Sequence, residues 1–332
     1  MNVYPWQQAQ WQRVAQAITA DRLSHGLLLH GPAGIGLTRF SRVLAARLLC
    51  DRPDAAPACG ACKACILVDS GNHPDLELIE PEEPGKQIKV EQIRDLIDFM
   101  HLKSQYGKYK IAIIEPAEAM NTNAANTLLK TLEEPPATSV LILNSHDPQR
   151  LPVTVRSRCQ SIAFGLAGDS TAATWLGEQI NDSGMDPEQL LQLAGAPLAA
   201  LDMVEGKQIE QRQQLVDDLV HLGRSDADPV AVAGRWAGLE TGVAVRWLQR
   251  LFMDMLKLKL SEQPPGFGSS DVIGRLRPLV NGLDLREIVS CCQLLARINA
   301  QLGSTVTYNK QALLEEFVFL WRSVATSGGV SQ

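Results

Sequence analysis

The sequence has no excess of positive charge and no long apolar run, and each absence excludes a class of protein. Its 332 residues carry a net charge of −6, which argues against a surface that grips nucleic acid by bulk electrostatics. No stretch approaches the ~20 consecutive apolar residues of a membrane-spanning helix, and the first residues lack the basic and then apolar run of a signal peptide. We therefore expect a cytoplasmic protein without a membrane partner, whose DNA contacts, if any, are local or shared with other subunits.

A lysine is also missing, from an otherwise regular phosphate-binding loop. The run Gly31-Pro32-Ala33-Gly34-Ile35-Gly36-Leu37-Thr38 keeps the glycine spacing of a Walker A motif, but Leu37 stands where the phosphate-contacting lysine belongs. Backbone N–H groups at a helix N-terminus can still surround a phosphate. A charge-assisted hydrogen bond contributes roughly 1.5 to 3 kcal/mol, so its loss weakens nucleotide binding by about one or two orders of magnitude. A glycine-rich turn without a nucleotide is the simpler alternative.

A second catalytic motif is incomplete at the distance expected for a Walker B strand. Residues 110–118 read as a buried apolar strand that ends in an acid, Glu115. A working strand ends in Asp followed by Glu, which hold Mg²⁺ and polarise the attacking water. Here Pro116 follows Glu115, and proline supplies neither an acid nor a backbone donor. Two losses in one site favour a decayed nucleotide site that does not hydrolyse ATP.

Four of the seven cysteines lie close together, at Cys50, Cys59, Cys62 and Cys65. Short spacings of this kind let thiolates converge at about 2.3 Å from one Zn²⁺ ion. Because four thiolates leave no open position, the zinc would be structural. Disulfide pairing is disfavoured in a cytosolic protein, and an iron–sulfur cluster is the other thiolate alternative. The remaining cysteines, Cys159, Cys291 and Cys292, are expected to be packing residues.

The pattern of elements changes from α/β to all-α at about residue 165. Before that point, expected strands at 26–29, 75–80, 111–115 and 139–143 alternate with expected helices at 38–49, 90–100 and 123–134. This alternation is typical of a parallel sheet covered on both faces. Short helices are expected at 171–180, 187–194 and 197–204. Longer ones are expected at 208–222, 229–239, 243–260, 285–302 and 311–324, with a loop at 263–270.

The first half of the chain resembles the bacterial clamp-loader subunits of the AAA+ class. The matching features are a Trp-bearing N-terminal helix, the four-cysteine insertion, His73-Pro74-Asp75, the segment 123–136 and the segment 151–159 that ends in Ser157-Arg158-Cys159. The resemblance implies three domains. Residues 1–165 would form a RecA-like AAA+ domain with the zinc insertion, residues 166–207 a small helical lid, and residues 208–332 a helical collar for oligomerisation.

The same resemblance implies roles for two arginine positions. Arg158 would act in trans as an arginine finger, a catalytic contact to ATP held by the neighbouring subunit, because a planar and always ionised guanidinium suits charge on a transferred phosphoryl group. Arg156 is a weaker candidate and is expected to be structural. In residues 195–201, Leu198 stands where working members have an arginine that senses the bound nucleotide. The chain's own nucleotide site therefore lacks this arginine as well as the lysine and the second acid, while Arg158 remains available to a neighbouring subunit.

These features predict an ATPase-inactive stator subunit of a clamp loader, with no ATPase or polymerase activity of its own. Its implied partners are gamma or tau and delta subunits, the sliding clamp indirectly, and primed DNA through the assembled complex. One alternative is a gamma or tau type subunit that hydrolyses ATP, against which Leu37, Pro116 and Leu198 argue. Another is a zinc-dependent DNA-binding module, disfavoured because Lys63 is the only basic residue between the clustered cysteines.

Overall fold

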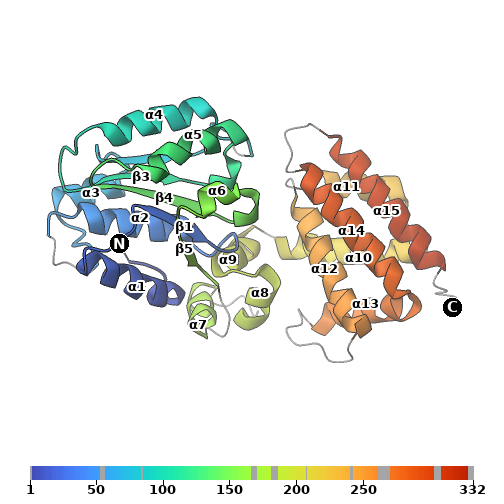
Figure 1. Ribbon diagram of the computed structural model, residues 1–332. Coiled ribbons are helices and arrows are strands. Elements are labelled where there is room, and N and C mark those ends of the chain that lie inside the picture. The colour runs from blue at the N-terminus through green and yellow to red at the C-terminus, as the bar shows by residue number, and fades with distance from the viewer. Residues whose placement is uncertain are drawn as a thin grey trace. The chain divides into compact units, whose positions relative to one another are not determined.

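The computed structural model describes residues 2–52, 57–83, 85–165, 170–180, 186–206, 208–239, 242–260, 270–302 and 308–327 (Figure 1). The expected loop at 263–270 lies almost wholly outside these residues. The chain divides into two compact units, residues 1–181 with 195–199 and residues 182–194 with 200–332. The division of the chain into three domains stays a prediction. Among the described residues, no helix is both long and apolar enough to cross a membrane.

The first unit is built on a five-stranded parallel sheet in the order β2-β3-β4-β1-β5. The strands are β1 Gly26–His30, β2 Leu76–Ile79, β3 Lys110–Ile114, β4 Ser139–Ser145 and β5 Gln160–Ala163. Every residue of β3 and β4 is buried, as expected for central strands covered on both faces. The α/β prediction, with a parallel sheet, is thus confirmed.

Helices cover the two faces of this sheet, with α4 and α5 on one side and α1 and α2 on the other (Figure 1). The helices of this unit are α1 Gln8–Thr19, α2 Leu37–Leu49, α3 Lys63–Asp69, α4 Val90–His101, α5 Thr122–Glu133, α6 Val153–Arg156 and α7 Ser170–Gln179; the short 3-10 turns are η1 Pro5–Gln7, η2 Ala117–Ala119 and η3 Pro148–Arg150. The apolar faces of α4 and α5 bury Ile93, Leu96 and Leu128 against the sheet. This packing places the ends of β1, β3 and β4 at one edge.

The second unit contains only helices among its described residues. These are α8 Pro187–Ala194, α10 Gln208–Gly223, α11 Pro229–Ala237, α12 Val243–Leu260, α13 Ser270–Gly282, α14 Leu285–Leu302 and α15 Lys310–Ser327; α9 Pro197–Glu205 runs from one unit into the other. An aromatic group forms the centre of its core: the Phe252 ring lies edge-on to Phe317 at 5.4 Å and to Trp321 at 5.1 Å. The all-α prediction for this half is confirmed.

The sequence interpretation missed α3 and α6, which are short, and also β5 and α13. β5 is a short edge strand with mostly exposed side chains, so it lacks the apolar run that marks the other strands. α13 contains Pro278 inside the helix, and proline in a helical pattern normally predicts an end or a kink. Side chains cap two of the helices: Asp186 accepts from the Glu188 N–H at the start of α8, and at the start of α14 the Asp284 N–H donates to Glu287 while the Asp284 carboxylate accepts from the Arg286 N–H.

Candidate functional site

The glycine-rich loop at residues 31–36 lies between β1 and α2, at the edge of the sheet where the sequence predicts a nucleotide site (Figure 1). Gly34 and Gly36 adopt positive φ angles of 82° and 90°, which favour glycine. Leu37 begins α2 and is only 1% exposed. Its side chain is therefore a core residue, and no cation extends from this position toward a phosphate.

The N-terminal segment packs directly against the loop. A Cβ on Gly36 would lie 2.7 Å from the Tyr4 ring, so that ring touches the loop. Trp6 Nε1 donates to the Ile35 carbonyl at 3.0 Å, and Gln7 Nε2 donates to the Ile35 and Gly36 carbonyls at 2.9 and 3.0 Å. The side chains of Tyr4, Trp6 and Gln7 thus contact the loop and hold its backbone in place.

The first turn of α9 holds the loop at Gly34. The Leu198 N–H donates to the Gly34 carbonyl at 3.1 Å, and a Cβ on Gly34 would lie 2.6 Å from the Ala199 nitrogen. The position at which the resemblance expects a nucleotide-sensing arginine therefore lies beside the loop. Its side chain is apolar, so it supplies no charge for a phosphate.

Glu115, the acid that ends the Walker B-like strand, is bonded by two neutral side chains. Thr38 Oγ1 donates to Glu115 Oε1 at 2.5 Å, and Asn144 Nδ2 donates to Glu115 Oε2 at 3.0 Å. The Asn144 amide also donates to Ser41 Oγ at 2.9 Å. The hydroxyl that binds Mg²⁺ in a working site is thus bonded to Glu115 instead, while Pro116 supplies no second acid.

Sequence reasoning missed three side chains of this site, namely Tyr4, Gln7 and Asn144. Asn144 lies in β4 directly after its apolar run, so a polar residue near the end of a buried strand was the available signal. Tyr4 precedes η1 and Gln7 is its last residue, and only the cluster of aromatic residues at 4–11 pointed to this segment. Their contacts with the loop span about 30 positions of sequence, which no local pattern reveals.

Arg158 lies away from this loop, in the turn between α6 and β5. Its Nη1 donates to the Thr154 carbonyl at 2.9 Å, and its Nη2 is paired with Glu133 at the end of α5. The side chains of Arg158 and Glu133 are 34% and 50% exposed, so the pair is accessible at the surface. Arg156, by contrast, has a buried Nε without a hydrogen-bond partner among the described residues.

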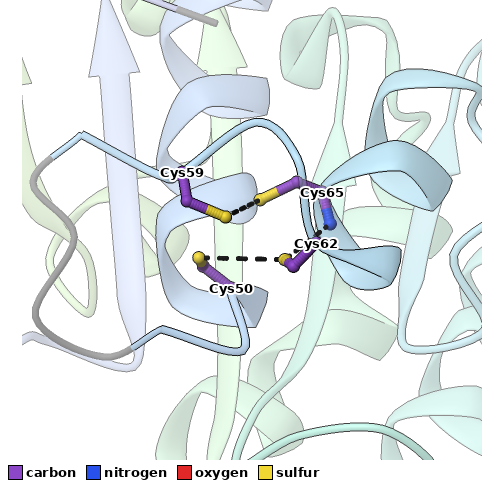
Figure 2. Close-up of side chains that lie close together, drawn as sticks. All are labelled: Cys50, Cys59, Cys62 and Cys65. Atoms are coloured by element: carbon purple, nitrogen blue, oxygen red, sulfur yellow. Dashed lines mark hydrogen bonds between the residues drawn. The ribbon is translucent and has the colours of Figure 1, made fainter.

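The four clustered cysteines converge on one point, as Figure 2 shows. Their Sγ atoms all lie within 4.8 Å of one another, with Cys50 and Cys62 at 3.9 Å and Cys59 and Cys65 at 4.0 Å. A tetrahedral Zn²⁺ with bonds of about 2.3 Å places its sulfur ligands ~3.8 Å apart. The thiol set therefore fits a tetrahedral ion such as zinc, which would be a structural ion because no ligand position is left open.

Hydrogen bonds and burial change the pKa values of two of these thiols in opposite directions. The backbone N–H groups of Ala61 and Cys62 lower the pKa of Cys59 to about 6. Burial raises the pKa of Cys65 to about 12, so this thiol must lose a proton when it binds a metal. Cys62 also caps α3, because its Sγ accepts from the Cys65 N–H at 3.4 Å.

A buried ion pair supports the segment that follows the cysteine insertion. Asp75, fully buried, accepts from the N–H groups of Gln105 and Tyr106 and from Lys110 Nζ at 3.2 Å. Burial raises the pKa of Asp75, but these hydrogen bonds outweigh it and the net pKa is lowered. The His73-Pro74-Asp75 motif thus has a structural role, since it fixes the loop before β3.

Comparison with known proteins gives matches along nearly the whole chain. A family model described as DNA polymerase III, delta subunit, matches residues 6–167, and one described as DNA polymerase III, delta subunit, C terminal, matches residues 206–323. DNA polymerase III subunit delta' of Pseudomonas aeruginosa is 36% identical over 329 residues, which cover 98% of this chain and 99% of the relative. Subunit tau of Escherichia coli is 36% identical over 146 residues, 44% of this chain and 22% of the relative.

Among solved structures, a DNA polymerase III gamma subunit-related protein from Thermotoga maritima is similar, with a TM-score of 0.46 and 19% identity. The similarity covers 95% of this chain and 99% of that one. The full-length identity to curated delta' subunits agrees with the sequence interpretation. The chain therefore belongs to the family of DNA polymerase III delta' subunits.

Proposed function

We propose that the chain is an ATPase-inactive stator subunit of the bacterial replicative clamp loader. In this role it supplies Arg158 to ATP bound by a neighbouring gamma or tau subunit, and it supports the delta subunit while the sliding clamp is placed on primed DNA. The assembly would work in the cytoplasm. The observation that carries the proposal is an asymmetry: the chain's own nucleotide site lacks its charged groups, while a surface arginine is retained elsewhere.

Three features support an inactive site. Leu37 contributes no phosphate-binding charge and is buried. Both carboxylate oxygens of Glu115 already accept a hydrogen bond, from Thr38 and from Asn144, and these bonds compete with a hydrated Mg²⁺ ion for the carboxylate. The Tyr4 ring lies against Gly36, where it narrows the approach to the loop. With Pro116 in place of the second acid, the strand end also lacks the base that activates water in a working site.

The surroundings of Arg158 support a contact in trans. The Arg158–Glu133 pair is exposed, and exposed ion pairs contribute only about 0–1 kcal/mol. Arg158 can therefore leave Glu133 for a triphosphate on another subunit at little cost. The guanidinium is also anchored at the Thr154 carbonyl, so its direction is restrained before a partner arrives.

The cysteine cluster supports Zn²⁺ as a structural cofactor of this subunit. The ion would join the insertion at 50–65 to the AAA+ domain. It would take no part in ATP chemistry, because the cluster and the loop are separate groups of residues with no side chain in common.

The proposal is tested by measuring ATP turnover on the purified chain and on the complex reconstituted with gamma or tau and delta. The account expects no turnover by the chain alone, and complex turnover that falls when Arg158→Ala replaces the unmodified chain. Hydrolysis by the chain alone would instead identify a gamma or tau type ATPase.

A further inference from the structure

The second unit contains a hollow of about 550 Å³ between α8 and α12. Basic side chains on α12, namely Arg246, Arg250 and Lys257, line it, and Asp254 is the acidic residue in its wall. The size lies within the range of ligand-binding clefts. A basic lining stands out in a chain whose net charge is −6.

A buried arginine adds to the positive charge of this region. Arg212, on α10, is only 5% exposed. Burial lowers its pKa to about 10, with Asp254 raising it and Arg250 lowering it further. Arg212 is therefore still a cation at neutral pH, within electrostatic reach of two residues that line the hollow.

The single carboxylate does not balance these cations. Asp254 already pairs with Lys257 at 3.3 Å, and Arg250 uses an Nη2 N–H for the Gln192 carbonyl. A guanidinium has five N–H groups, so Arg250 retains donors for a ligand. Arg246 is exposed at the same wall, one helical turn before Arg250.

We propose that this hollow is a phosphate-binding site that takes the backbone of a single nucleic acid strand. Arg246 and Arg250 are separated by about 6 Å along α12 and Arg246 and Lys257 by about 16 Å, so they can contact successive phosphates of one strand. Guanidinium groups match phosphate geometry in a bidentate way. Met253 and the amides of Gln192 and Gln249 complete the lining, and they offer a base or sugar both apolar and hydrogen-bonding surface. The site is independent of the function proposed for Arg158.

The test measures binding of a fluorescein-labelled single-stranded oligothymidylate to the full chain by anisotropy, over a series of salt concentrations. Labelled AMP and labelled oligoglutamate are measured in parallel. Arg246→Gln is the main variant because Arg246 is exposed. Arg246→Gln/Arg250→Gln is the second, and thermal unfolding verifies that both fold. Arg286→Gln, an exposed arginine near the start of α14, is the matched control for the change in charge.

We expect the oligothymidylate to bind roughly tenfold more weakly to Arg246→Gln, as for one lost charged hydrogen bond. The slope of log K against log salt should fall by about 0.7 for each lost phosphate contact. Arg286→Gln should leave both quantities unchanged. If Arg246→Gln instead weakens the binding of AMP and not that of the oligothymidylate, the hollow is a phosphate site for free nucleotides, and its assignment to a nucleic acid strand is wrong. Equal binding by all variants, no binding of either phosphate ligand at low salt, or binding of oligoglutamate alone would overturn the proposal.

Discussion

Removal of the proposed zinc should unfold the cysteine insertion and leave the sheet intact. The four Sγ atoms already lie within 4.8 Å of one another, and zinc requires about 3.8 Å, so each separation has to change by about 1 Å at most. Structural zinc in peptides that must fold on binding is worth roughly 10–16 kcal/mol at pH 7, and we expect nanomolar affinity or better here.

Cys65→Ser is the informative variant, because Cys65 is buried at 5% exposure and lies within α3. Loss of an outer hydrogen-bond partner already costs about 10–100-fold in metal affinity, and loss of a thiolate ligand should cost more. α3 has seven residues, too few to be stable alone in water. Its amides should lose protection from hydrogen exchange, while those of β1, β3 and β4 keep theirs.

The assay combines zinc content of protein purified without chelator, determined by colorimetric release, with hydrogen exchange followed by mass spectrometry. Cys159→Ser is the control, since Cys159 lies outside the cluster and should leave one zinc per chain. The reasoning is refuted if the unmodified chain holds no zinc, if Cys65→Ser holds as much as the control, or if α3 exchanges equally with and without metal.

Two further variants test the buried ion pair and the degenerate loop. Asp75→Asn should lower the free energy of unfolding by about 3–5 kcal/mol at pH 7, because it leaves Lys110, 3% exposed, without a counter-charge. The folded-state pKa of Asp75 lies below its ordinary value of 3.8, so the ion pair contributes its full stability above pH ~4 and loses it as the pH falls through the folded-state pKa. Urea unfolding of both proteins between pH 7 and 3 measures this loss. A difference in unfolding free energy that stays the same at low pH would contradict the prediction. Leu37→Lys/Pro116→Glu should cost about 1.5–3 kcal/mol of stability, because an apolar core side chain is lost. The same variant should hydrolyse no ATP in a coupled assay, since Tyr4 and the bonds to Glu115 remain; turnover there would show that two residues alone disable the site.

Local patterns in the sequence were enough to predict most of the sheet and the convergence of the four cysteines. The strands β1, β3 and β4 are short apolar runs, and the cysteine spacings bring thiols together with little help from the rest of the fold. The Walker A and Walker B patterns also predicted that the loop and Glu115 lie close together. The loop follows β1 and Glu115 follows β3, and these parallel strands end at the same edge of the sheet.

Contacts between distant segments could not be predicted in this way. Tyr4 packs on Gly36, and the Asn144 side chain donates to Glu115. Both contacts join segments that are far apart in the sequence and meet only in the folded chain. The ion pair between Arg158 and Glu133 joins residues 25 positions apart, and no periodic pattern relates them. The hollow beside α12 combines side chains of two helices, α8 and α12, that are about 50 positions apart in the sequence.

The most direct test of the account is the rate of ATP hydrolysis by the reconstituted complex when only Arg158 is changed. Arg158→Ala is compared with Arg94→Ala, an exposed arginine on α4, and with Glu133→Gln, which removes the partner that Arg158 has in the isolated chain. An arginine finger contributes roughly 10³ to 10⁵ in rate at the site it serves. The account predicts that Arg158→Ala abolishes the share of turnover due to the adjacent site, while the other two variants stay near the unmodified rate. Equal turnover and equal clamp loading with Arg158→Ala would contradict it.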